Sequence, residues 1–315
     1  MNGNYYMKTM FTKLFFMSVF FSSFALADNI YNDQHQKTKK IPAYIIDLPS
    51  SVSDIFIADA SSETMFRYSK TRDGIIKKDE RYMSIGLEGV GKKFSGDQKT
   101  PLGIYFITKK LDTSNLAPKY GVAAYPLDYP NAWDKYNGRT GYGIWIHGVD
   151  EKEPNRPPQD TDGCLTLSNQ ELLLLEKNLR PDVTPVVVTR NINWVSEEDI
   201  KRLRFDFQKA VEMWRISLEE GDLSTYLSFY DKKFRSGDMD FYQWSEYQSK
   251  LFENVKIEDI VFENMMMFSD PEESDLFLSK FTQTVRTIDG SLKNNKRLYW
   301  RLSSNQWYIV SEDST

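Results

Sequence analysis

The chain has 315 residues, of which 40% are hydrophobic and 14% aromatic, and this length is sufficient for two globular domains with separate cores. Its formal net charge is -5, from 40 basic and 45 acidic residues, and it contains no long run of lysine or arginine. The composition therefore gives no indication of a nucleic-acid-binding surface.

Residues 1–27 have the three parts of a secretory signal peptide. Lys8 and Lys13 supply positive charge, residues 14–24 form a short apolar core, and residues 25–27 (Ala-Leu-Ala) form a small-x-small cleavage site. The apolar core has about eleven residues, whereas a membrane-spanning helix needs about 20. We therefore expect cleavage before Asp28, export to the periplasm or cell envelope, and no stable membrane span afterwards.

The first half of the mature chain is predicted to be rich in strands. Residues 28–53 begin with a polar stretch and are expected to form an N-terminal arm, in which His35 is a solvated histidine. From residue 54, short apolar runs alternate with turns that contain glycine or proline, which is typical of a β-sandwich or barrel. Strands are expected over 55–59, 64–68, 82–86, 104–108, 143–147 and 186–189, and a helix over 169–178.

The second half has a different pattern, after a linker at 191–204. Ser196 is a candidate N-cap for an amphipathic helix of about two dozen residues that ends at Gly221. Further helices are expected over 223–230 and 242–252, and strands over 255–268, 276–288, 297–303 and 306–311. Helices followed by an antiparallel sheet indicate an α+β domain over 205–315.

The residues that carry chemistry lie between 143 and 167. This segment holds His147, one of two histidines, and Cys164, the only cysteine. An exported protein with one cysteine has no intramolecular disulfide, so the thiol is either buried as a small apolar group or used. His147 follows the apolar residues 144–146 at a strand end, and the polar loop 149–160 can return Cys164 to it, as thiol catalysis requires.

Gly163 precedes Cys164 and has no Cβ, so its backbone can adopt a positive φ and approach a substrate closely. The N–H groups of Gly163 and Cys164 are therefore candidate donors for an oxyanion hole.

Three motifs in order resemble the L,D-transpeptidase catalytic domain (the YkuD family). His147-Gly148 and residues 161–164 (Thr-Asp-Gly-Cys) resemble its His-Gly and Ser/Thr-His-Gly-Cys motifs. Residues 99–106 (KTPLGIYF) resemble its Thr-Pro-x-Gly-x-Phe segment, and residues 129–133 and 138–144 resemble its approach to the catalytic histidine. The resemblance covers about residues 54–190.

The resemblance implies a β-rich, YkuD-like β-sandwich in which Cys164 is the nucleophile and His147 its base. The carbonyl of Gly148 would orient the imidazole, and Gly163 with Cys164 would supply the oxyanion hole. Members of this family attack the L,D-bond after the third residue, usually diaminopimelate, of a peptidoglycan stem. They form a thioester and pass the acyl group to an amine or to water, and neither a metal nor an organic cofactor is implied.

Two positions depart from the family pattern. Asp162 stands where the family usually has histidine, and Thr166 stands where it often has an arginine that is expected to hold a substrate carboxylate. Threonine cannot form the bidentate pair that arginine forms. We expect Thr161, Asp162 and Thr166 to lie in the substrate-binding part of the site, with Arg139 or Arg156 as replacements for the missing arginine. For each arginine, the alternative is a solvated loop residue.

Residues 164–169 (Cys-Leu-Thr-Leu-Ser-Asn) resemble the branch that includes cell-shape L,D-carboxypeptidases and lipoprotein-releasing amidases. The helix-helix-helix-sheet order after residue 205, with a closing hairpin at 300–310, resembles the cone-shaped nuclear transport factor 2-like (SnoaL-like) fold. Cell-shape carboxypeptidases of curved and helical bacteria join these two domains. Fold alone does not give the function of the second domain, so a homo-oligomer or a protein partner through it stays open.

The leading hypothesis is an exported L,D-transpeptidase that acts on peptidoglycan stem peptides and transfers the acyl group to an amine. The first alternative is transfer to water, an L,D-carboxypeptidase activity, which Asp162, Thr166 and the second domain favour. The second alternative is a non-catalytic module that binds the cell wall.

Overall fold

The computed structural model describes residues 39–314, and residues 40–314 belong to one compact unit. The predicted signal peptide and His35 lie outside the described residues. Within the described residues, no helix is long and apolar enough to cross a membrane.

A five-stranded sheet is the centre of the first domain, and its strand order is β5-β4-β3-β12-β7. Its strands are β3 (Asp54–Asp59), β4 (Thr64–Thr71), β5 (Gly74–Tyr82), β7 (Gly103–Phe106) and β12 (Pro185–Thr189). Side chains alternate between the two faces of a strand, so Val186 and Val188 enter one core and Val187 enters another. The continuous apolar runs in β3 and β12 reflect this burial on both faces.

Shorter elements cover one face of this sheet and carry the candidate site. A three-stranded sheet contains β8 (Ala124–Pro126), β9 (Trp145–His147) and β11 (Leu165–Thr166), in the order β11-β9-β8. Beside it, β6 (Ile85–Gly86) pairs with β10 (Gln159–Thr161), and α3 (Asn169–Leu175) follows β11. Residues such as Phe56, Ile146 and Leu172 fill the core between these layers.

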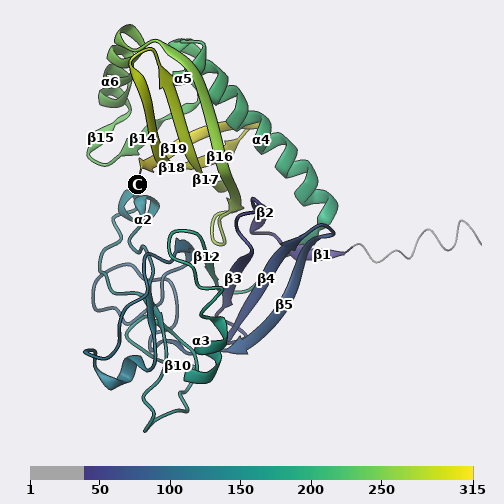
Figure 1. Ribbon diagram of the computed structural model, residues 1–315, viewed down its shortest axis with the longest axis vertical. Helices are drawn as coiled ribbons and strands as arrows, with labels where there is room; N and C mark the ends of the chain where they lie inside the picture. The colour runs from purple at the N-terminus through teal and green to yellow at the C-terminus, as the bar shows by residue number, and fades with distance from the viewer. Residues whose placement is uncertain (1–38, 315) are drawn as a thin grey trace, which may run out of the picture. The chain divides into compact units, whose positions relative to one another are not determined.

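The second domain places helices against a long curved sheet (Figure 1). Its helices are α4 (Glu197–Glu219), α5 (Leu223–Ser228) and α6 (Phe241–Asn254). Its strands are β14 (Tyr230–Ser236), β15 (Met239–Asp240), β16 (Ile257–Ser269), β17 (Leu276–Thr287), β18 (Gly290–Ser303) and β19 (Gln306–Ser314). Phe207 and Trp214 of α4 pack on Phe277 and Trp300 of this sheet, as the spacing of apolar residues predicts.

The N-terminal segment differs from the expected arm where the structure describes it. β1 (Lys40–Pro42) pairs with β13 (Trp194–Ser196), and β2 (Ile45–Asp47) adds an edge strand to the C-terminal sheet beside β16. The side chains of Ile45 and Ile46 are 0% exposed, so burial of apolar surface explains why this segment is ordered. Likewise, α4 begins inside the segment expected as a linker at 191–204.

The two domains share a core. Ile57, Phe106 and Val187 from the five-stranded sheet pack in one cluster with Phe268 and Tyr299 from the C-terminal sheet. The short helix α2 (Ala132–Tyr136) adds Trp133, which stacks on Tyr299 at a centroid distance of 5.9 Å. The fold is therefore the predicted β-rich domain followed by an α+β domain, and the two are joined by packing as well as by the chain.

Candidate active site

His147 and Cys164 lie at two neighbouring strands, β9 and β11. β9 and β11 are parallel, with Leu165 opposite Ile146 and Thr166 opposite His147. Cys164 comes directly before β11, and because side chains alternate along an extended chain, it faces the same side as Thr166. The strand pairing therefore brings together the two residues that the sequence motif predicts as a pair.

The imidazole of His147 has a defined tautomer. Its Nδ1 lies 2.7 Å from the carbonyl oxygen of Gly148. A carbonyl can only accept a hydrogen bond, so in the neutral ring Nδ1 carries the proton and Nε2 is left as an acceptor. Burial lowers the pKa of His147 to about 4, although the bond to Gly148 raises it. The ring is therefore neutral at pH 7 and can accept a proton at Nε2.

Thr166 contacts that same nitrogen. Its Oγ1 lies 3.3 Å from Nε2 of His147, and since Nε2 is the acceptor, the hydroxyl donates. The side chain is only 2% exposed. Thr166, which we expect from the sequence to bind substrate, is thus a hydrogen-bond partner of the candidate base.

Asn169, the first residue of α3, holds the peptide group that joins Gly148 to Val149, and this group carries the Gly148 carbonyl. Asn169 Oδ1 accepts the backbone N–H groups of Val149 at 3.0 Å and Val122 at 3.3 Å, and its amide donates to the carbonyl of Val149 at 2.9 Å. A Cβ at position 148 would lie 2.1 Å from Asn169 Oδ1, so only glycine fits there. This explains why glycine follows the histidine in this chain.

The thiol of Cys164 is enclosed. It is 7% exposed, and its Sγ contacts the carbonyl oxygen of Gly143 at 3.4 Å. Burial raises the pKa of Cys164 to about 11, against a backbone hydrogen bond from Trp145 that lowers it, and the charge of Asp162 raises it further. At pH 7 the pair is thus a neutral thiol beside a neutral imidazole, and the thiol needs a base when it attacks.

The turn before the thiol is fixed by internal hydrogen bonds. Gly163 has φ +122, and a Cβ there would lie 2.6 Å from the carbonyl oxygen of Lys99. Its N–H donates to Thr161 Oγ1 at 3.0 Å, and that hydroxyl donates to the carbonyl of Cys164 at 2.8 Å. Thr161, predicted to lie among the substrate-binding residues, is buried and orders the turn. The N–H of Gly163, predicted for the oxyanion hole, already has a partner in this state.

A segment that the motifs do not identify packs on the His147 ring and forms an ion pair with Asp162. In a short 3-10 helix (Pro118–Tyr120), Tyr120 packs edge-on to the His147 ring at a centroid distance of 5.1 Å and against Trp145 at 4.7 Å. Lys119 forms an ion pair with Asp162 at 3.2 Å, and this aspartate is 73% exposed. Asp162 therefore lies at the open side of the site, and the Pro118 and Gly121 turn signals are the sequence feature that could have located this covering segment.

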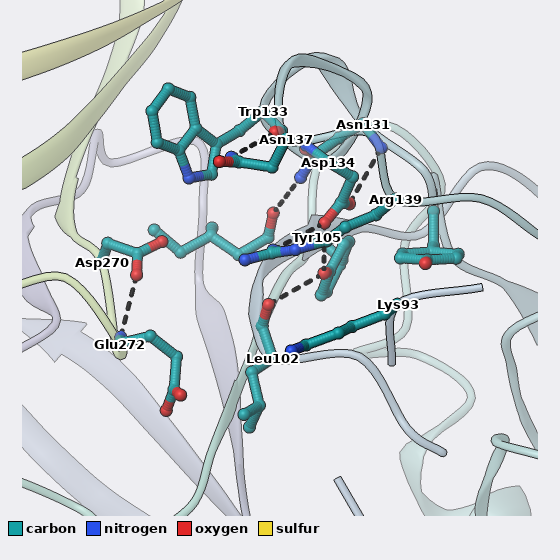
Figure 2. A network of polar contacts seen from close by, with 12 residues as sticks. Lys93, Leu102, Tyr105, Asn131, Trp133, Asp134, Asn137, Arg139, Asp270 and Glu272 are labelled. Carbon is teal, nitrogen blue, oxygen red and sulfur yellow. Dashed lines mark hydrogen bonds and ion pairs between the residues drawn. The ribbon is translucent and has the colours of Figure 1, made fainter. Parts of the chain in front are cut away.

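The two arginines considered as carboxylate ligands lie in different surroundings. Arg139 forms an ion pair with Asp134, a buried residue of α2, at 3.0 Å (Figure 2). Arg156 donates to the carbonyl of Asp160 at 3.0 Å, and its charge lowers the pKa of both His147 and Cys164. Of the two, Arg156 is thus the one whose charge acts on the candidate catalytic pair.

Both domains match known families. Residues 53–188 match the L,D-transpeptidase catalytic domain, YkuD, and residues 206–313 match the Cds6 C-terminal NTF2-like domain. No curated protein matches the chain.

Solved structures resemble nearly the whole chain. The helical cell shape determining protein Pgp2 from Campylobacter jejuni is 26% identical, with a TM-score of 0.71, and the match covers 91% of this chain and 98% of that chain. Bd1075 from Bdellovibrio bacteriovorus is 24% identical, with a TM-score of 0.73 over 88% of this chain and 98% of that chain, and supports the fold alone. The protein described here therefore consists of a YkuD-family L,D-transpeptidase catalytic domain followed by a C-terminal NTF2-like domain.

Proposed function

We propose that the chain is an exported cysteine enzyme that cleaves the L,D-bond after diaminopimelate in peptidoglycan tetrapeptide stems. Its catalytic domain belongs to a family that acts on peptidoglycan. The observation that carries the proposal is the 2.7 Å bond from His147 Nδ1 to Gly148, which leaves Nε2 as a base on the strand next to Cys164. Export is the part of the proposal that depends on the sequence of residues 1–27.

The neutral pair defines the order of proton transfers. As Sγ of Cys164 attacks the carbonyl carbon of diaminopimelate, Nε2 of His147 takes the thiol proton. The C–N bond then breaks, the imidazolium gives that proton to the leaving amine, and a thioester and D-alanine result. In the second half, Nε2 takes a proton from the acceptor as it attacks the thioester. The same proton returns to the sulfur when the C–S bond breaks.

We propose water as the acceptor, which makes the enzyme an L,D-carboxypeptidase. The reasons are Asp162 and Thr166, which depart from the motif of the family, and the presence of the second domain, since the similarity to a helical cell shape determining protein extends across both domains, over 91% of this chain. A role in cell shape follows as part of the same proposal. This reverses the order of the sequence hypotheses, in which transfer to an amine comes first.

The first prediction concerns the products. The mature protein, incubated with disaccharide tetrapeptide, should yield disaccharide tripeptide and free D-alanine, which chromatography separates. Cys164→Ala should lower this rate at least a thousandfold while leaving the melting temperature near that of the wild type, because the nucleophile is lost and little else changes.

Other products would change the conclusion. Cross-linked dimers would replace hydrolysis by transfer to an amine. Full activity in Cys164→Ala would exclude the cysteine mechanism. Binding to sacculi without any product would favour the non-catalytic module.

A further inference from the structure

A cavity of about 350 Å³ lies where the catalytic domain meets the C-terminal sheet, and we call it the junction cavity. Arg180 and Asp182 line it from the segment between α3 and β12, and Asn264, Lys280 and Asn295 line it from β16, β17 and β18. Its volume lies in the range of about 300–1,000 Å³ that is usual for small-molecule sites. None of the lining residues belongs to the candidate active site.

Two cations in this cavity lack a carboxylate partner. Arg180 donates to the carbonyl of Ser51 at 3.1 Å, and Lys280 Nζ donates to the carbonyl of Asp182 at 3.2 Å and lies 4.8 Å from the ring of Phe106. Neither side chain forms an ion pair with any residue in the described part of the chain. Burial, followed by the charge of Arg297, lowers the pKa of Lys280, although the charges of Asp128, Asp182 and Asp313 partly oppose this. A bound anion would offset the cost of burying the Lys280 ammonium, because it would add an opposite charge beside a group that now contacts the Asp182 carbonyl and the Phe106 ring.

Two asparagines add donors to the same lining. Asn264 Oδ1 accepts the hydroxyl of Ser51 at 2.6 Å, and Asn295 Oδ1 accepts the hydroxyl of Thr282 at 2.9 Å. Each amide oxygen has a partner, whereas neither NH₂ group donates to another described residue, so both can donate to a ligand.

The charge and the shape of the junction cavity restrict the ligand. Asp182 is the one carboxylate in the lining, so two cations and one anion give a net charge of +1. The buried side chains of Val52, Met266 and Phe281 form an apolar floor beneath these polar groups. A donor-rich, net positive wall over an apolar floor fits an organic carboxylate better than a small inorganic ion, which would leave the floor uncovered.

We propose that the junction cavity binds the carboxylate end of a peptide, as the stem peptides of peptidoglycan provide, at a second site separate from Cys164. The choice of stem peptides rests on the proposed function, whereas carboxylate binding rests on the cavity itself. Such a site would hold a stem or a product while the active site acts elsewhere, and two linked sites on one polymer increase avidity.

The second prediction is tested with the mature chain carrying Cys164→Ala, titrated with the free tripeptide L-Ala-γ-D-Glu-diaminopimelate and followed by methyl NMR. The methyl groups of Val52 and Met266 report the junction cavity, and that of Ile144, beside Gly163, reports the active site. Arg180→Gln and Lys280→Gln should each weaken binding at the cavity about tenfold, because each removes a charged hydrogen bond.

Matched controls use exposed residues of the same types. Arg72→Gln and Lys209→Gln should leave the titration of Val52 and Met266 unchanged, since both side chains are exposed and neither lines the cavity. Arg180 is exposed, so Arg180→Gln should keep the wild-type melting temperature even where Lys280→Gln lowers it.

Two further ligands test whether the junction cavity recognises a peptide carboxylate or any anion. The tripeptide with its carboxylates amidated should bind the cavity at least tenfold more weakly, and inorganic phosphate should not displace the free tripeptide at equal concentration. Equal binding of the amide, unchanged binding in Arg180→Gln, or a response of Val52 and Met266 to phosphate alone would each overturn the proposal.

Failure of this inference differs from failure of the proposed function. Arg180→Gln in the chain with Cys164 intact should cleave soluble disaccharide tetrapeptide at the wild-type rate. If the wild type cleaves nothing but the Val52 and Met266 signals respond to tripeptide through Arg180, the proposed function fails and the junction cavity stands. If the wild type cleaves the substrate but the Val52 and Met266 signals do not respond to tripeptide, the ligand proposal for the junction cavity fails and the proposed function stands.

Discussion

Thr166 shows how one side chain can exchange one role for another within a motif. Its position predicts a contact with substrate, because the family often has arginine there. In the structure its hydroxyl donates instead to Nε2 of His147 at 3.3 Å, the nitrogen that takes the thiol proton in the proposed mechanism. A hydrogen bond to the neutral ring favours the neutral form, so Thr166 both orients the base and keeps it unprotonated.

The third prediction follows from this contact. The proposed mechanism requires neutral His147, so kcat/KM of the wild type should fall as the pH decreases through about 4, the pKa of the buried ring. Thr166→Val removes the donor, which should raise the pKa of His147, move this acid limb to higher pH and lower kcat/KM by about tenfold. Thr166→Ser retains the hydroxyl and should restore both values. An acid limb that stays in place in Thr166→Val would show that the contact does not act on the base.

The candidate catalytic pair can be located from the sequence, whereas its surroundings cannot. Cys164, His147 and Gly148 stand in a linear motif, and their spacing is visible without a structure. Thr161 accepts a hydrogen bond within its own turn, and Arg139 forms an ion pair with Asp134. Both interactions depend on backbone geometry that the spacing of residues in the sequence does not predict. Tyr120 is brought to His147 by a segment remote in sequence, so only the turn signals on either side mark it.

Among the elements, α3 links the base to the covering segment through its first residue. Asn169 accepts two backbone N–H groups, from Val149 and from Val122, and donates to the carbonyl of Val149. Val122 belongs to the turn that follows Tyr120, and Val149 follows Gly148. One amide therefore fixes the carbonyl that orients His147 and the segment that covers its ring.

The fourth prediction concerns Asn169→Ala. This substitution leaves the N–H of buried Val149 without a partner, which should cost about 1–3 kcal/mol in the free energy of unfolding. It should also lower kcat about tenfold, because the Gly148 carbonyl loses its support. Asn169→Asp keeps the acceptor and loses only the donor, so both effects should be smaller, as urea unfolding and steady-state kinetics can measure. Wild-type kcat in Asn169→Ala would contradict the positioning role.

The elements that the sequence predicts well are those with a clear pattern. The apolar runs give β3 and β12, and the spacing of three and four gives α4, with Ser196 as its N-cap as predicted. β5 (Gly74–Tyr82) is missed because it is an edge strand with many exposed charged residues. β2 is missed because its partner β16 lies over 200 residues away, and pairing over such a distance leaves no local signal.

For the molecule as a whole, the sequence predicts two domains with separate cores, whereas in the structure the two domains share a core at their junction. Beside the shared apolar core, Arg297 of β18 forms an ion pair with Asp128 of the catalytic domain. Figure 2 shows the Arg139 side chain, which pairs with Asp134, pointing toward Asp270, the residue after β16. The sequence pattern of neither domain predicts the ion pair of Arg297 with Asp128 or the effect of the Arg139 charge on Asp270, since each arises only when both domains are folded.

Asp270 makes the stability of this junction depend on pH. Its carboxylate accepts the N–H groups of Glu272 at 2.8 Å and Glu273 at 3.0 Å. Burial nevertheless raises the pKa of Asp270 to about 7, from a value of 3.8 for a free side chain, and the charge of Arg139 only partly opposes this. The folded state thus binds the proton more tightly than the unfolded state does. The contribution of Asp270 is therefore fully present below about pH 4 and is lost as the pH rises through about 7.

The fifth prediction follows from that sign. Asp270→Asn keeps an oxygen that can accept both N–H groups but carries no charge at any pH. Its contribution to the free energy of unfolding should therefore not decrease as the pH rises. The difference in the free energy of unfolding, variant minus wild type, should increase between pH 5 and pH 8 by about 1–2 kcal/mol, measured by urea unfolding at each pH. Asp289→Asn, at an exposed turn between β17 and β18, is the matched control and should show no such increase. If the difference for Asp270→Asn is the same at both pH values, the carboxylate of Asp270 does not titrate with folding, and the charge at the junction is balanced by Arg139.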